Sequence, residues 1–245
     1  MFTQIGTSLF AIGRVEESLV YMHKALNCPP STKVVAINLN KIYNERISKN
    51  PNDIEAYIGW ADVLAHIDRK SDAARYYVNS ANIAVESGER ALAKSLYEKA
   101  VREMPSNCEA NFMYGTMLLD DGMIGEAPRY LLAASYAHNC SGTFVYSIGR
   151  LNFIYQQVAE GAKEEKEPLV SLGDLRRISE RLSAAVEDPE FNKAKEKVLE
   201  EAAAAATKDK KMPTEAGKKD TLDVSTLGTS DEGYVLVEDD DEDDE

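Results

Sequence analysis

The sequence predicts an all-α protein in which antiparallel helical hairpins stack in a row, with capping helices and an acidic tail behind them. Three observations lead to this fold class. Small, apolar and turn-forming residues recur about every 34 residues, an interval typical of helical-hairpin repeats. Glycines and prolines stand at matching places in successive copies. After residue 207 the apolar content collapses and acidic residues dominate.

The repeat is clearest in the middle of the chain. The first copy contains Tyr77, Ser80, Ala81, Ala84, Gly88, Ala93, Tyr97, Ala100 and Pro105, and the second contains Asn111, Tyr114, Gly115, Leu118, Gly122, Ala127, Leu131, Ala134 and Asn139. A third copy begins at Val145, Ile148, Gly149 and Asn152, and an earlier one runs from Phe2 to Pro30. At equivalent positions of successive copies, a small residue mostly matches a small residue and a turn-forming residue mostly matches a turn-forming residue.

A helical hairpin explains this spacing. Two helices that cross closely leave room only for a small residue at the contact, as expected at Gly6, Gly115 and Ala93. A glycine between the helices adopts the left-handed conformation that ends the first one; these glycines are Gly13, Gly88 and Gly122. Proline ends the second helix because it cannot continue one; these prolines are Pro30, Pro51 and Pro105.

Between residues 31 and 73 the repeat is less regular. Val34 to Ser48 and Ile54 to Ile67 read as two amphipathic helices joined at Pro51. Tyr57, Trp60, Ala61 and Ala74 also fit the repeat in a competing register. The sequence thus predicts the helices of this region and leaves their register open.

Three further helices are expected after the hairpins, at 141–166, 172–186 and 190–206. The last one is rich in Glu, Lys and Ala, which suits a solvated capping helix. From Thr207 onward the chain cannot bury enough apolar surface to offset the entropy of ordering it. We therefore expect a repeat array of about four to five hairpins over 1–165, a helical cap over 166–206 and a disordered acidic tail over 207–245.

These residues make the chain resemble the tetratricopeptide-repeat (TPR) family over about residues 1 to 165. The family pattern places an aromatic residue, a small residue, a tyrosine, a glycine, an alanine and a proline at these offsets. The resemblance implies a right-handed superhelical solenoid. It also implies a protein-binding scaffold whose concave groove, lined by the first helix of each hairpin, holds a segment of a partner.

The groove positions of the family can be carried over residue by residue. They correspond to Arg75, Val78, Asn82, Val85, Glu109, Phe112, Thr116, Leu119, Thr143, Tyr146, Arg150 and Phe153. Phe112, Tyr146 and Phe153 are the expected anchors, because aromatic side chains dominate interface energetics. The alternative is that a neighbouring helix or the C-terminal cap covers them.

Some family members grip the carboxylate end of a chaperone with a lysine and two asparagines in the groove. This sequence keeps only Asn82 of that set, and Val78 stands where the pattern requires lysine. Capture of a chaperone tail is therefore disfavoured.

No catalytic constellation is found in the sequence. His23, His66 and His138 lie a repeat apart or more, so we expect them not to meet in space. No spacing of metal ligands, nucleophile elbow or phosphate-binding loop is present, so neither enzyme activity nor a cofactor or metal is expected. Cys28, Cys108 and Cys140 include no CxxC pair, which argues against disulfides and for a reducing compartment, the cytoplasm or alternatively the nucleus.

The charge is concentrated at the C-terminus. The formal net charge is -14, and residues 207–245 alone hold fourteen acids against five lysines. Phosphate backbones repel such a chain, so nucleic acid is not an expected partner, and no apolar run is long enough to insert into a membrane. Eight consecutive acids, Glu238 to Glu245, would instead attract a basic protein.

A short apolar run precedes these acids and has the form of a docking motif. It consists of Tyr234, Val235, Leu236 and Val237. Such a run could add a strand to a partner or fold back into the chain's own groove. Two functions follow: an adaptor that binds through the groove, or a chaperone-like carrier of a highly basic client that binds through the tail.

The first predicted helix begins almost at Met1 without a capping segment. The flank of the first hairpin is then expected to be apolar. Self-association, or assembly into a larger complex through this hairpin, would cover that flank; alternatively, the chain is the C-terminal part of a longer protein.

Overall fold

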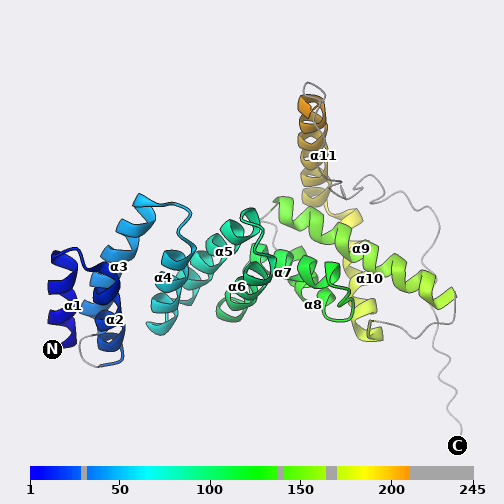
Figure 1. The fold of residues 1–245 in the computed structure, drawn as a ribbon. Helices are drawn as coiled ribbons and strands as arrows, with labels where there is room; N and C mark the ends of the chain where they lie inside the picture. The colour runs from blue at the N-terminus through cyan, green and yellow to red at the C-terminus, as the bar shows by residue number, and fades with distance from the viewer. Residues whose placement is uncertain (29–31, 137–140, 164–169, 210–245) are drawn as a thin grey trace, which may run out of the picture.

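A computed structural model describes residues 1–28, 32–136, 141–163 and 170–209. These residues form eleven α-helices and no strand. Figure 1 shows the helices following one another in a row, with the last two at the far end from the N-terminus. The expected all-α class is confirmed.

The helices match the predicted ones closely. They are α1 (Phe2–Ala11), α2 (Val15–Leu26), α3 (Thr32–Lys49), α4 (Ile54–His66), α5 (Lys70–Glu86), α6 (Arg90–Glu103), α7 (Cys108–Asp120), α8 (Ala127–Ser135), α9 (Ser141–Lys163), α10 (Leu172–Glu187) and α11 (Pro189–Asp209). Helix α11 runs through residues 207–209, where the sequence predicted a disordered tail, because its Ala-rich end favours helix. The rest of the predicted disordered tail, 210–245, lies outside the described residues.

Consecutive helices pack against each other throughout the row. The contacts are so close at some glycines that no Cβ would fit. A Cβ on Gly6 would lie 2.9 Å from Met22 Cγ, and one on Gly59 would lie 2.5 Å from the Tyr43 hydroxyl. Small residues thus let the helices approach, as predicted at Gly6, but the contact at Gly59 was not predicted.

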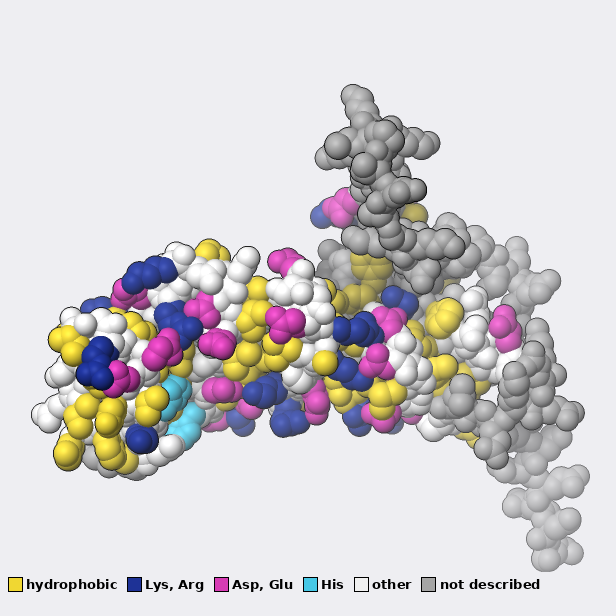
Figure 2. Space-filling model, viewed as in Figure 1, with side chains coloured by type: hydrophobic (Ala, Val, Ile, Leu, Met, Phe, Trp, Pro, Cys, Tyr) yellow, Lys and Arg dark blue, Asp and Glu magenta, His cyan; other side chains and the backbone are white. Residues whose placement is uncertain are grey.

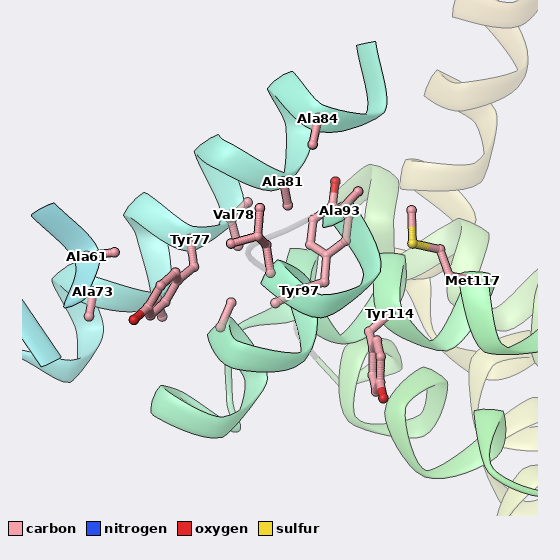
Figure 3. Close-up of a cluster of buried hydrophobic side chains, with 14 of the residues drawn as sticks. Ala61, Ala73, Tyr77, Val78, Ala81, Ala84, Ala93, Tyr97, Tyr114 and Met117 are labelled. Carbon is pink, nitrogen blue, oxygen red and sulfur yellow. The ribbon is translucent and has the colours of Figure 1, made fainter. Parts of the chain in front are cut away.

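The middle of the row has a core of alternating small and aromatic residues (Figure 3). Ala81 and Ala93 are fully buried where α5 meets α6, and Tyr97 fills the space beside them. The Tyr77 hydroxyl donates a 2.5 Å hydrogen bond to Asp62 Oδ1 of α4. Each large ring therefore buries its apolar body while its hydroxyl finds an acceptor at the edge of the core.

Four tight turns share one backbone conformation. Gly13, Asp68, Gly88 and Gly122 have φ angles of 81°, 61°, 77° and 77°. At Gly88, the N–H of the next residue, Glu89, donates to the Ala84 carbonyl at 2.8 Å, which is the Schellman ending of a helix. The three glycine turns confirm the sequence prediction, whereas Asp68 makes the same turn without a glycine.

The turn at Asp68 explains the competing registers in the sequence. Because tight turns precede and follow α5, this helix packs closely against both α4 and α6. It can therefore be read as the second helix of one hairpin or as the first helix of the next. The longer connections to α4 and α7 contain Pro51 and Pro105, and their last residues, Asp53 and Asn107, cap the helices that follow.

Helices α10 and α11 pack against the end of the row. The Phe191 ring of α11 meets the Phe144 ring of α9 edge-on, with centroids 5.4 Å apart. Arg181 of α10 is only 5% exposed. Its Nε donates to the Ser135 carbonyl at 3.2 Å, and its guanidinium lies over the Tyr136 and Phe144 rings. One buried cation thus joins α10 to α8 and α9.

The expectation of reduced cysteines is wrong for Cys108, which is disulfide-bonded. Spacing along the sequence does not reveal which residues the packing of the helices brings together. The cysteines therefore no longer support a reducing compartment.

We predict that Gly88→Ala lowers the free energy of unfolding by about 1 kcal/mol, because a side chain in the left-handed region is strained. No atom lies within 4 Å of the added Cβ, so the loss would report the backbone alone. Gly161→Ala is the matched control, since this α9 glycine is equally open but has no positive φ, and alanine favours helix there. Denaturant unfolding that finds the two variants equally stable would contradict the assignment.

Candidate functional site

The predicted groove residues lie on α5, α7 and α9, and contacts between their side chains join these helices. Asn82 Nδ2 of α5 donates to Glu109 Oε1 of α7 at 2.9 Å. The Phe112 ring of α7 lies 6.3 Å from the Tyr146 ring of α9, centroid to centroid. The structure therefore brings predicted residues of three helices onto one surface. We call it the α5–α7–α9 face and define it by Arg75, Asn82, Glu109, Phe112, Thr116, Tyr146, Arg150 and Phe153.

Two of the three predicted anchors are accessible. Tyr146 is 36% exposed and Phe153 is 44% exposed, while Phe112 is partly buried. Tyr146 and Phe153 lie seven residues apart on α9, which places them on the same side of the helix. Helices α10 and α11 therefore leave Tyr146 and Phe153 uncovered.

Two predicted groove residues belong to the core instead. Val78 is 3% exposed and Leu119 is 8% exposed. Val78 belongs to the hydrophobic core, although Arg75 on the same helix is exposed. Neither side chain is available to a partner.

The polar part of the face is anchored in the core. The Tyr97 hydroxyl of α6 donates to Asn82 Oδ1, which leaves the Asn82 amide nitrogen to bind Glu109. Burial raises the pKa of Tyr97, so its hydroxyl stays a donor at neutral pH. Arg75 is exposed and pairs with Asp72 at 3.3 Å.

Thr116 adds an unsatisfied polar atom to this face. Its hydroxyl is buried and has no hydrogen-bond partner within the part of the chain that the structure describes. A buried hydroxyl without a partner costs about 1–3 kcal/mol.

A second cluster of functional groups lies on α2, α3 and α4. His23 Nε2 is 2.7 Å from the Tyr43 hydroxyl, and the Tyr43 ring contacts Trp60 with centroids 6.2 Å apart. His66 and Asp62 lie close enough to His23 to act on its charge. Figure 2 shows the histidines as a cyan patch near the N-terminal helices.

His23 and His66 lie nearer to each other than the sequence predicts, within reach of each other's charge. Helices α2 and α4 both pack on α3, which brings the two residues near each other although they are distant in sequence. His138 lies outside the described residues. Burial lowers the pKa of His23, Asp62 opposes this shift, and His66 adds to it.

The chemistry of this cluster is that of a structural hydrogen bond. Burial raises the pKa of Tyr43 to about 12, so Tyr43 is neutral at pH 7 and so is His23. The lowered pKa of His23 and the raised pKa of Tyr43 both favour the neutral pair, which suits a structural hydrogen bond better than proton transfer. Within residues 1–28, 32–136, 141–163 and 170–209, no group of three or more His, Cys, Asp or Glu side chains could hold a metal ion.

The predicted docking motif at 234–237 and the acids after it lie outside the described residues. No family model matches this chain, and no curated protein matches it. Among the described helices, none combines the length and the apolar character needed to cross a membrane.

We predict that the protein loses stability as pH falls below 6.5 and that His23→Gln reduces this loss. Because the folded-state pKa of His23 lies below its unfolded value of 6.5, the unfolded chain binds the proton first. Stability is thus complete above pH 6.5 and declines toward the folded pKa. Denaturant unfolding between about pH 7.5 and 5.5, above the ordinary range of carboxylates, measures it.

His66→Gln is the control for this experiment. Burial is the largest cause of the low pKa of His23, so most of the pH dependence should survive removal of His66. A slope that vanishes with His66→Gln and persists with His23→Gln would contradict the assignment.

Proposed function

We propose that this chain is a non-catalytic protein-binding scaffold of the TPR type, which holds a segment of a partner on the α5–α7–α9 face. The observation that carries the proposal is the pair of exposed aromatic side chains, Tyr146 and Phe153, on one side of α9. Large exposed apolar side chains beside polar ones mark interaction surfaces. Buried aromatics supply most of the binding energy in such interfaces.

The surroundings of the aromatic pair suit a binding surface. Phe112 packs beside Tyr146 and would extend the apolar centre. Asn82, Glu109 and Arg150 supply polar groups around it, as expected for the rim of an interface. Because Tyr97 holds Asn82 in place, part of this rim is already ordered before a partner binds, which lowers the entropy cost of binding.

The local geometry supports the TPR-type architecture. The repeat requires paired helices, left-handed turn residues and close helix crossings. The turn residues are Gly13, Gly88 and Gly122, and the close crossings are at Gly6 and Gly115. We propose that the hairpins form a right-handed superhelix whose concave side is the α5–α7–α9 face. The two tight turns around α5 are a local departure from simple pairing.

A carrier of a basic protein client is the second candidate. Glu238 to Glu245 is a run of eight acids, and such a polyanion would attract a basic client at low salt and release it as salt rises. Nucleic acid is not proposed as a partner of the scaffold or of the carrier. The proposed location of the protein is the cytoplasm or the nucleus.

Self-association through the first hairpin is a further part of the proposal. Met1 and Ile12 are 91% and 68% exposed, and Val20 of α2 is 52% exposed. Apolar surface on the outer helices would be covered if another subunit packed there. Mass measurement in solution tests this: we expect a dimer or larger species at high concentration, and only monomer over a broad range of concentrations would contradict it.

We predict that Tyr146→Ala with Phe153→Ala reduces capture of the partner from cell extract at least tenfold, at low and at high salt. Each aromatic anchor is expected to contribute about 2 kcal/mol to the binding free energy, so the loss of both would weaken binding by more than tenfold. Leu172→Ala with Val186→Ala is the matched control, since both residues are exposed apolar side chains of α10.

A chain ending at Asp209 separates the two candidate functions. Partners that survive truncation and high salt but disappear with the double aromatic substitution place binding on the α5–α7–α9 face. Partners that are lost on truncation or at high salt, and are indifferent to Tyr146 and Phe153, would overturn the scaffold proposal in favour of the carrier.

A further inference from the structure

A concavity of about 710 Å³ lies between α3, the end of α4 and the loop that follows it. It is separate from the α5–α7–α9 face, and it shares Trp60 and His66 with the cluster around His23 and Tyr43. We call it the α3–α4 pocket. The residues that matter for its chemistry are Lys33 and Ile37 of α3, Trp60 and His66 of α4, and Ile67 and Arg69 of the loop.

The close contact of α3 with α4 accounts for the position of the pocket. Gly59 lets Tyr43 approach α4 in the second half of α3. Ile37 of α3 and Trp60 of α4 make part of the wall of the pocket apolar. Trp60 is almost buried at 6% exposure, and Ile37 stands out at 69% exposure. An isoleucine so exposed beside a tryptophan is surface that a ligand could cover.

The rim of the pocket carries positive charge. Lys33 and Arg69 supply this charge, and both are exposed. Lys33 also lies in the first turn of α3, where the helix dipole adds to the attraction for anions. The acids nearby are already engaged, since Asp68 pairs with Lys70 at 3.5 Å and Asp72 pairs with Arg69 and Arg75.

We propose that the α3–α4 pocket binds the C-terminal segment of the same chain, residues 234–245. The occupant combines the two properties that the pocket requires. Tyr234 and Leu236 alternate with valines, so in an extended segment they lie on one side and can cover Ile37 and Trp60. The eight acids that follow would meet the cationic rim.

The chain is long enough for this contact. Twenty-four residues lie between Asp209 and Tyr234, and the twenty-five steps from one to the other reach about 85 Å when extended. Five helix spacings of at most about 10 Å separate α4 from α9, and the 21 residues of α11 add no more than about 31 Å.

The pocket fits the acidic segment better than the α5–α7–α9 face does. That face carries the carboxylate of Glu109 beside Asn82, and its Arg75 is paired with Asp72. At the pocket, Arg69 pairs with the same Asp72, whereas Lys33 has no carboxylate in the ion pairs that the described residues form. The carboxylate of Glu109 would repel the acidic segment from that face, and Lys33 would attract it to the pocket.

The lone tryptophan makes the proposal testable in the full-length protein. Trp60 is the only tryptophan in the chain, so incorporation of 5-fluorotryptophan gives one fluorine resonance from the pocket. We expect Tyr234→Ser with Leu236→Ser to shift this resonance. Leu222→Ser with Leu227→Ser, matched tail changes outside the motif, should leave it in place.

Reversal of the rim charges identifies the site. We call the variant with Tyr234→Ser and Leu236→Ser the serine-tail variant. When Lys33→Glu and Arg69→Glu are also present, the difference in the fluorine resonance between the wild-type tail and the serine tail should vanish. With Arg75→Glu and Arg150→Glu on the other face, the difference should persist. Addition of a synthetic peptide of residues 228–245 to the serine-tail variant should restore the wild-type resonance.

Three results would overturn the proposal. The first is a fluorine resonance that the serine tail leaves unchanged. The second is a resonance difference that depends on Arg75 and Arg150 instead of Lys33 and Arg69. The third is a resonance difference that grows with protein concentration, which would indicate that the tail of a second copy binds. The test is independent of the proposed function of the α5–α7–α9 face. Tyr146→Ala with Phe153→Ala should not alter the difference in the fluorine resonance between the wild-type tail and the serine tail.

Discussion

Close helix crossing at small residues is the constraint on which the row of helices depends. Where Gly59 faces Tyr43, or Gly115 faces Leu131, a single added methyl group would displace a buried side chain. Each crossing fixes the distance between two helices, and each helix then positions the next one. The placement of α5, α7 and α9 on one face follows from this chain of contacts, and so does the opening between α3 and α4, where the close crossing at Gly59 ends.

Much of the fold could be predicted from the sequence because its local signals are strong. Glycines at 13, 88 and 122 mark the turns, and the helix bounds follow from apolar periodicity and prolines. The turn at Asp68 was missed because aspartate adopts the left-handed conformation only occasionally. This turn brings α5 against α4, as the turn at Gly88 brings it against α6. Val78, which was predicted to line a groove, is buried.

The candidate sites were harder to predict because they depend on contacts between distant residues. The family pattern identified Asn82, Phe112 and Tyr146, which do meet across helices. The same pattern says nothing of the Tyr97 hydroxyl that holds Asn82. The approach of His23 to His66, and the exposure of Ile37 beside Trp60, arise from the packing of α3, for which the sequence left the register open.

The tight turns at both ends of α5 also bear on how the chain folds. Between residues 54 and 103, three helices pack through turns of only three residues, so their contacts join residues that are near in sequence. Closing such short loops costs little entropy, and local contacts form quickly. This segment is therefore suited to act as the folding nucleus, from which structure would spread toward α1 on one side and α11 on the other.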